Sequence, residues 1–355
     1  MNPAVNMALR PWREGDADDL VEACNDPLTQ RYLPLLPDPY TRSDALAYIG
    51  NGDTARAAVV DRDTDEVLGA IGYTPGRDGG AEIGYWVMPA ARGRRVATTA
   101  VELFSAQLFQ SDFQRLYLQT ALPNLASQRV AIAAGFVREG IARGASRNRD
   151  GSRYDTVVWA RLADDPPGPS PRALPDLPDG RLTDGVVVLR PLTEDDGLVT
   201  YDMRILPEVS GRSVVGQPID PAAVTRQCAE SGAKWLAGQR AEMTIRRAGD
   251  DAYLGEIALY YAEPLLREAM IGYSLAPEAR GHGYAARAAR LVTDWGFEIG
   301  MNRMIAGTAV DNVASQRVLE AAGYSRESVQ LTRLPGPDGT RIDNVAFAKL
   351  RPAAI

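Results

Sequence analysis

Residues 270–285 read MIGYSLAPEARGHGYA, in which an apolar segment passes through a proline into a glycine-rich turn. Residues 269–275 have the composition of a strand, and the apolar residues after the turn recur with helical spacing. Small residues at positions 281, 283 and 285 let backbone N–H groups approach an anion, and the helix dipole adds partial positive charge there. Arg280 can contact a phosphate directly. The pattern predicts a diphosphate site, although for such a turn taken alone a turn without a ligand is the alternative.

A similar segment occurs 188 residues earlier in the chain. Residues 82–97 read EIGYWVMPAARGRRVA, and the Leu-Arg-Pro of residues 9–11 recurs at residues 189–191. Four further pairs keep the separation of 188 residues: Asn124 and Asn312, Ser127 and Ser315, Gly135 and Gly323, and Asp155 and Asp343. One separation held over so many landmarks predicts two copies of one domain.

A proline-rich stretch divides the two copies. Residues 163–184 contain six prolines and show neither helical nor strand periodicity, so we expect an extended linker. The total length of 355 residues suits two domains of common size. We therefore expect an N-terminal domain over residues 1–162 and a C-terminal domain over residues 185–355.

Hydrophobic periodicity and turn residues predict a similar order of elements in each copy. In the first copy we expect strands at 7–11, 56–61, 66–74, 81–87, 115–121, 137–143 and 153–162, and helices at 14–25, 42–50, 93–110 and 125–134. In the second copy we expect strands at 186–190, 241–247, 252–261, 269–275, 304–310, 325–334 and 341–350, and helices at 194–203, 222–237, 282–299 and 313–322. This mixture predicts an α+β fold with helices on both faces of each sheet.

Composition narrows the class of protein. A net charge of −7 with 45% hydrophobic residues is ordinary for a soluble globular protein and argues weakly against nucleic acid as a partner. Two cysteines and one histidine are too few for a disulfide framework or a zinc site. Residues 1–7 lack the basic flank and apolar region of a signal peptide, and no window offers about 18 consecutive apolar residues. We expect a cytoplasmic protein without a metal or a membrane partner.

The motifs after the two strands resemble those of the GNAT N-acetyltransferase superfamily. Arg-x-x-Gly-x-Ala follows a strand carrying Ile-Gly-Tyr, and about thirty residues later comes Asn-x-x-Ser-x-x-Val-(x)4-Gly-aromatic. The second copy supplies Asn312, Ser315, Val318, Gly323 and Tyr324, and the first supplies Asn124, Ser127, Val130, Gly135 and Phe136. The Leu-Arg-Pro opening and the serine are similar to the branch that acetylates amino termini of ribosomal proteins. Another branch has a catalytic tyrosine four residues before the glycine, where this chain has Ala131 and Leu319.

The resemblance implies acetyl-CoA as acyl donor and, in each copy, a mixed and mostly antiparallel sheet with two splayed strands. It implies that the diphosphate lies on Arg280, Gly281, His282, Gly283, Tyr284 and Ala285, with the pantetheine along the strand near Leu275 and the thioester near Asn312 and Ser315. The corresponding positions of the first copy are Val87, Arg92, Gly93, Arg94, Arg95, Val96, Ala97 and Asn124. Backbone N–H near Leu275 is expected to stabilise the oxyanion, and Ser315 to serve the sulfur; a helix-capping role is the alternative for Ser315.

The copies differ at the phosphate loop and at the candidate base. Arg95 stands where the second copy has Gly283, so its side chain either fills the pocket or swings outward. We expect the first copy to be catalytically silent, with a second, slower active site as the alternative. In the superfamily a strand-borne general base often sits at the position of Glu82, where the second copy has Met270.

The missing base constrains the acceptor. At pH 7 an α-amine of pKa about 7.8 is neutral roughly one time in seven, whereas a lysine amine near 10.4 is neutral roughly once in 2,500. We therefore expect the α-amine of a peptide or protein, attacking directly in a ternary complex. A small-molecule amine, such as an antibiotic or a mycothiol-type acceptor, and a non-catalytic acyl-CoA-binding protein are the alternatives. Glu256 is the candidate base, with Glu268 as a second choice and an exposed structural role as the alternative for both.

The remaining candidates have plainer interpretations. His282 is expected to contribute its backbone N–H, and Cys24 and Cys228 to be small apolar fillers. Asp155 and Asp343 face either the substrate groove or solvent. The irregular stretches 33–40 and 206–221 are expected to form acceptor loops, and the protein to be a monomer or a homodimer.

Overall fold

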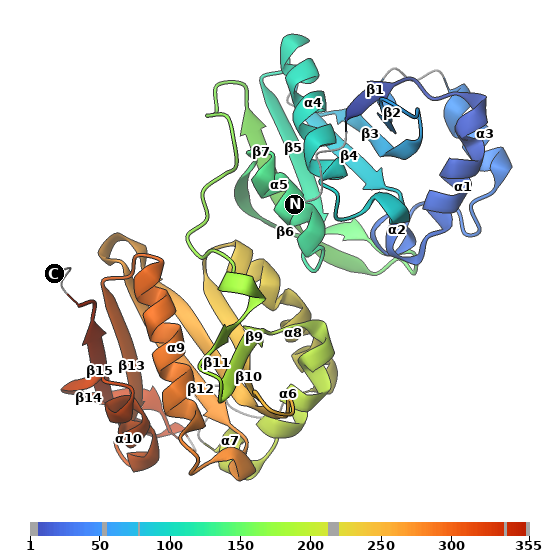
Figure 1. The fold of residues 1–355 in the computed structure, drawn as a ribbon. Helices are drawn as coiled ribbons and strands as arrows, with labels where there is room; N and C mark the ends of the chain where they lie inside the picture. The colour runs from blue at the N-terminus through green and yellow to red at the C-terminus, as the bar shows by residue number, and fades with distance from the viewer. Residues whose placement is uncertain (1–5, 52–54, 77–78, 212–219, 337–338, 353–355) are drawn as a thin grey trace. The chain divides into compact units, whose positions relative to one another are not determined.

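The computed structural model describes residues 6–51, 55–76, 79–211, 220–336 and 339–352. The chain separates into two compact units, Met1–Pro171 and Arg172–Ile355, which are called the N-terminal and C-terminal units below (Figure 1). Each unit contains one sheet with helices packed on it. No helix in the described ranges has the length and apolarity needed to cross a bilayer.

The N-terminal unit has a seven-stranded sheet in the order β1-β2-β3-β4-β5-β7-β6. Its strands are β1 Met7–Arg10, β2 Arg56–Asp61, β3 Val67–Pro75, β4 Ala81–Val87, β5 Arg115–Ala121, β6 Val137–Arg147 and β7 Arg153–Leu162. Its helices are α1 Ala17–Asn25, α2 Pro27–Tyr32, α3 Arg42–Gly50, α4 Val96–Gln110 and α5 Leu125–Ala133. All neighbouring strands are antiparallel except β4 and β5.

The C-terminal unit has an eight-stranded sheet in the order β14-β15-β13-β12-β11-β10-β9-β8. Its strands are β8 Leu182–Thr183, β9 Val187–Pro191, β10 Arg240–Arg247, β11 Tyr253–Glu263, β12 Glu268–Leu275, β13 Arg303–Ala309, β14 Ser325–Pro335 and β15 Arg341–Leu350. Its helices are α6 Gly197–Arg204, α7 Pro207–Ser210, α8 Pro221–Leu236, α9 Tyr284–Glu298 and α10 Val313–Ala321. Here the parallel pair is β12 and β13.

The core of the C-terminal unit lies under helix α9, which runs along the sheet beside β11 and β12 (Figure 1). Ala288, Val292 and Trp295 recur at helical spacing and are at most 2% exposed. They belong to the same core cluster as Ile257 and Ile271 of the sheet. On the other face, Arg204 of α6 binds Glu256, the neighbour of Ile257 along β11. The expected α+β fold with helices on both sheet faces is confirmed.

The two parallel strands of each sheet diverge soon after they begin. Strand β12 pairs with β13 only over residues 268–270, and β4 pairs with β5 only at residues 81 and 82. Beyond these points β12 continues its pairing with β11 as far as Leu275, while β13 pairs along its whole length with β15. The edge of β12 after Met270 therefore offers backbone groups to a partner other than a strand.

The proline-rich stretch 163–184 is not uniformly extended, in contrast to the expectation from sequence. It contains the 3₁₀ helix η3 Pro178–Gly180 and strand β8, and Leu174 and Leu177 are buried in the core of the C-terminal unit. The indole N–H of Trp235 donates to the carbonyl of Pro175 at 2.9 Å. Prolines hide these roles because isolated leucines without periodicity can still fill a core.

Two short helices also fall where sequence periodicity predicts none. Helices α2 and α7 each begin with proline at the first helical position, where its missing N–H costs nothing. Helix α7 lies within the stretch 206–221 that was expected to be an irregular acceptor loop; residues 212–219 of that stretch lie outside the described residues.

Candidate active site

Strand β12 leads through the 3₁₀ helix η6 Pro277–Ala279 into the glycine-rich turn and then into α9. Gly281 and Gly283 have φ angles of +81° and +77°. A Cβ on either residue would meet no atom within 4 Å, so the backbone conformation rather than space favours glycine. Gly283 is the N-cap of the 15-residue helix α9 and provides no side-chain cap. The first N–H groups of α9 are therefore available to an anion.

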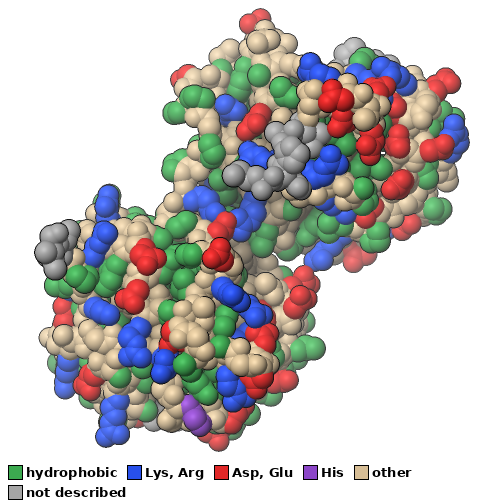
Figure 2. Space-filling view, viewed as in Figure 1, with side chains coloured by type: hydrophobic (Ala, Val, Ile, Leu, Met, Phe, Trp, Pro, Cys, Tyr) green, Lys and Arg blue, Asp and Glu red, His purple; other side chains and the backbone are tan. Residues whose placement is uncertain are grey.

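Arg280 lies at the start of this turn with its charge uncompensated. Its Nη2 donates to the backbone carbonyls of Glu208 in α7 and Leu275 in β12, both at 3.2 Å. Among the described residues no carboxylate lies within ion-pair distance of it. His282 is exposed, and its ring stacks on Tyr284 with centroids 5.5 Å apart. The histidine lies on the molecular surface (Figure 2), which is consistent with a role for its backbone rather than its ring.

The N-terminal unit repeats the backbone of this turn with a different N-cap residue. Gly93 has φ of +74°, and Arg95, at the position of Gly283, adopts φ of +62°. A left-handed conformation costs a residue with a Cβ roughly 1–2 kcal/mol. The side chain of Arg95 is exposed, so of the two alternatives raised by the sequence the outward orientation is found.

Arg92, the counterpart of Arg280, is held by a carboxylate. Its Nη2 donates to Oδ2 of Asp26 and, at 3.2 Å, to Oγ1 of Thr29. The hydrogen bond from Arg92 lowers the pKa of Asp26. Asp26 precedes Pro27 of α2, and the residue that precedes Pro207 of α7 is Leu206. Sequence reasoning missed this difference, and an Asp-Pro against a Leu-Pro at the start of the matching helices was the signal.

Asn312 and Ser315 lie together at the first turn of α10. Oδ1 of Asn312 accepts from the backbone N–H of Ser315 at 3.2 Å, so Asn312 is the helix cap and Ser315 is not. The hydroxyl of Ser315 lies 2.9 Å from the hydroxyl of Tyr273, which also donates to the Ser315 carbonyl at 3.2 Å. Asn124 caps α5 in the same way, through the N–H of Ser127 at 3.1 Å.

Tyr273 is a site residue that sequence reasoning did not single out, although it belongs to the quoted Ile-Gly-Tyr motif. It stands on the diverging part of β12 and reaches α10 across the splay between the strands. Burial raises its pKa to about 12, so its hydroxyl keeps its proton over the working range of an enzyme. Its counterpart Tyr85 donates to the Ser127 carbonyl at 3.4 Å.

Both carboxylates considered as general bases are ion-paired. The two oxygens of Glu256 accept from Nε and Nη2 of Arg204 at 3.0 and 2.7 Å. Oε2 of Glu268 accepts from Nε of Arg303 at 2.7 Å. Each pair joins elements far apart in the sequence, which is why the pattern of residues could not reveal it. With both oxygens of Glu256 occupied, this carboxylate is not free to take a proton from an amine.

The remaining candidates lie away from the phosphate loop. Oδ1 of Asp155 accepts from the N–H of Gly144 at 2.8 Å, and Oδ1 of Asp343 accepts from that of Thr332 at 2.7 Å. These bonds hold the irregular register of the closing hairpins. Cys24 and Cys228 are buried, and burial raises the pKa of each thiol to about 11. Their thiols are therefore poor nucleophiles.

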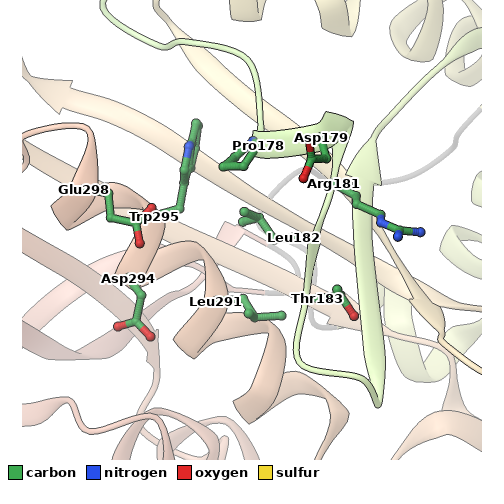
Figure 3. A pocket seen from close by; sticks show the side chains of 9 residues that line it. All are labelled: Pro178, Asp179, Arg181, Leu182, Thr183, Leu291, Asp294, Trp295 and Glu298. Carbon is green, nitrogen blue, oxygen red and sulfur yellow. The ribbon is translucent and has the colours of Figure 1, made fainter.

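A hollow of about 460 Å³ lies in the C-terminal unit between the segment 178–183 and the second half of α9 (Figure 3). Leu291, Asp294 and Glu298 line it from the helix, while Arg181 points away from them. Leu291 is seven residues beyond Tyr284, or about 10 Å along the helix axis. This hollow is therefore separate from the phosphate loop.

The model of the acetyltransferase (GNAT) domain matches residues 6–137 and again residues 187–325. The chain belongs to this family of acetyltransferases and contains its domain twice. The acyl donor of the family is acetyl-CoA.

Known proteins resemble parts of the chain. The probable N-acetyltransferase YjcK of Bacillus subtilis is 38% identical over 87 residues, which are 24% of this chain and 48% of that protein. The chain thus spans about half the length of this relative. Phosphinothricin N-acetyltransferase of Streptomyces coelicolor is 26% identical over 168 residues, 45% of this chain and 97% of that protein. Mycobacterium smegmatis RimJ, solved in complex with CoA-disulfide, is 23% identical with a TM-score of 0.43 and covers 48% of this chain and 84% of its own.

Proposed function

We propose that the protein is an acetyl-CoA-dependent N-acetyltransferase and that the C-terminal unit carries out the reaction. The observation that carries this proposal is the phosphate loop, in which Arg280 has no carboxylate partner among the described residues and the first turn of α9 has no side-chain cap. Both features leave positive potential for a diphosphate. In the N-terminal unit Asp26 already neutralises the corresponding Arg92.

Residues of this chain fit the whole length of the cofactor. Arg280 and the backbone N–H groups of residues 281–285 would hold the diphosphate, including those of Gly281, His282, Gly283, Tyr284 and Ala285. The free edge of β12 near Leu275 would pair with the amides of the pantetheine arm, as a sheet edge pairs with a peptide. When bound, acetyl-CoA supplies a thioester whose carbonyl carbon an amine can attack.

Side chains at the splay would assist the transfer. A backbone N–H on β12 near Leu275 is placed to donate to the carbonyl oxygen as negative charge develops there. Tyr273 donating to Oγ of Ser315 leaves the serine proton free to bond the sulfur position. Asn312 fixes Ser315 by capping α10. Glu256 serves to hold α6 against the sheet through Arg204, and the proton of the attacking amine passes to solvent.

The acceptor proposed is the α-amine of a peptide or protein. Met270 stands where the N-terminal unit has Glu82, and Glu256 and Glu268 are both ion-paired. A site without a free carboxylate favours an amine that is already neutral in an appreciable fraction at pH 7. The match to phosphinothricin N-acetyltransferase supports a small amine as the second candidate.

One screen tests both proposals. Purified protein with acetyl-CoA is offered α-amine peptides, lysine-containing peptides with blocked amino termini, and small amines, and CoA release is measured. We expect turnover with α-amine peptides. Turnover confined to small amines would replace the acceptor class. No release with any amine, together with tight acetyl-CoA binding by calorimetry, would favour a non-catalytic acyl-CoA-binding protein.

A further inference from the structure

The N-terminal unit presents an acid, a glycine and an aromatic residue in a row on one face of β4. Glu82, Gly84 and Trp86 alternate along the strand and therefore point to the same face, about 7 Å apart in succession. Tyr73 pairs with Ile83 and packs on Phe104 of α4, so α4 covers the opposite face. The three residues face away from α4.

The middle of this row is open. Gly84 is exposed, and a Cβ on it would meet no atom within 4 Å. Its cross-strand partner on β3 is Gly72, so no side chain from β3 stands beside it. On the other side the pairing with β5 ends at Glu82 and Tyr117. Two glycines and the splay thus leave a cradle between Glu82 and Trp86.

The acidic end of the cradle is oriented by a chain of hydrogen bonds. Oγ1 of Thr156, a residue only 2% exposed, donates to Oε1 of Gln119 at 3.1 Å. This bond directs the amide group of Gln119 toward Glu82, whose Oε2 accepts from Nε2 at 3.5 Å. Burial raises the pKa of Glu82, which shows that the carboxylate lacks full solvation and would gain from a cationic partner.

The aromatic end is fixed by packing. The ring of Trp86 lies 6.1 Å from that of Trp12, which in turn contacts Tyr48 of α3. Arg56, the cation on this face of β2, has its guanidinium 4.8 Å from the centre of the Tyr48 ring. A carboxylate at one end and an indole face at the other provide a counter-ion and a π surface for a cation.

The C-terminal unit has none of these features at the matching positions. Met270, Gly272 and Ser274 replace the row, and Gly307 replaces Gln119. A Cβ on Gly272 would lie 3.4 Å from Cε2 of Tyr260, so a tyrosine ring borders the position that is open at Gly84. The two units have thus specialised in opposite ways, since the unit with the neutralised phosphate loop is the one with the charged cradle.

We propose that the N-terminal unit binds a protonated primary amine in the cradle of Glu82, Gly84 and Trp86 and does not acetylate it. The amine is of the same chemical class as the acceptor, and this inference rests on the proposal that the C-terminal unit is the catalytic one. Such a site would hold acceptor or product on the protein while the other unit turns over.

The test is titration of the full chain without acetyl-CoA, using benzylammonium chloride as probe and benzyl alcohol as its neutral analogue, with calorimetry or ligand-observed NMR as readout. We expect saturable binding of the ammonium and roughly tenfold weaker binding of the alcohol. Glu82→Gln should weaken ammonium binding roughly tenfold. Gly84→Ile, which fills the cradle and leaves the carboxylate, should do the same and guards against misfolding of either variant.

Gly283→Arg, in the other unit, is the matched control, and it should bind the ammonium like the wild type. Wild-type affinity in both Glu82→Gln and Gly84→Ile, or the absence of saturable binding to the wild type, would overturn the amine site. The proposed function is judged separately, by the turnover of Gly283→Arg with acetyl-CoA. The two proposals can therefore fail independently.

Discussion

Helices α4 and α9 begin with the same left-handed turn, yet the arginine before each turn has a different environment. Arg92 before α4 is bound to the Asp26 carboxylate, whereas Arg280 before α9 contacts only backbone carbonyls among the described residues. A guanidinium already neutralised by a carboxylate has little to gain from a diphosphate. The comparison teaches that a phosphate loop can lose its ligand through a residue outside the loop while its backbone stays intact.

The largest effect is expected from exchanging the N-cap residues. Gly283→Arg places the residue of the N-terminal unit in the C-terminal loop, where it crowds the anion position and takes a strained φ. We expect turnover to fall by roughly two orders of magnitude or more, as two missing helix-terminal contacts would give. Steady-state kinetics measure this, with Arg95→Gly as the matched control that leaves turnover unchanged. Unaltered kinetics of Gly283→Arg would show that the active unit is wrongly assigned.

Removing the two arginines should separate binding from stability. Arg280→Ala should raise KM for acetyl-CoA by roughly thirtyfold, because a charge-assisted contact to the diphosphate is lost. Arg92→Ala should leave KM unchanged and lower Tm, because it removes the tie between α2 and the loop. Kinetics and thermal unfolding of both variants provide the check. An equal rise of KM in both would contradict the division between the units.

The carboxylate can also be transplanted. Leu206→Asp gives the C-terminal unit the counterpart of Asp26, and its carboxylate should pair with Arg280 and raise KM for acetyl-CoA about tenfold. Leu206→Asn is the control, since it perturbs the packing of this half-buried leucine without adding charge. If the two variants behave alike, the neutralising role assigned to Asp26 is wrong.

The pH dependence should reflect the acceptor amine alone. The value of kcat/KM should rise with pH, because only the neutral amine attacks, and should level off near pH 8, about sevenfold above its value at pH 7. Tyr273, with its pKa raised to about 12, stays protonated, so no decline is expected below about pH 10. A log-linear rise that continues to pH 10 would indicate a lysine-like acceptor.

The smallest effect is expected at the hydroxyl pair. Ser315→Ala should lower kcat by about threefold to tenfold, the loss of one hydrogen bond, and Tyr273→Phe by no more than that. Ser127→Ala in the N-terminal unit should leave kcat unchanged. The measurement is kcat at saturating acetyl-CoA, and a Ser127→Ala defect equal to that of Ser315→Ala would make both units catalytic.

The repeated pattern of strands, proline and glycine-rich turn was sufficient to predict the two domains and most of their elements. The alternation of apolar residues in β4 and β12 and the helical spacing after Gly283 are local signals, and local signals survive in sequence. The capping box of α3 at Thr41 and Asp44 was likewise readable and forms as expected. The prolines before α2 and α7 misled because they were taken to mark irregular loops.

Pairings between distant elements could not be read in this way. The partner of Arg92 lies 66 residues away and that of Glu256 lies 52 residues away, and no local pattern specifies which arginine meets which carboxylate. The sequence by itself determined the duplication, the α+β architecture and the position of the phosphate loops. Only the tertiary structure decided which loop keeps its charge, which carboxylates are occupied and where the open cradle lies, because electrostatic compensation and free space depend on residues that folding brings together.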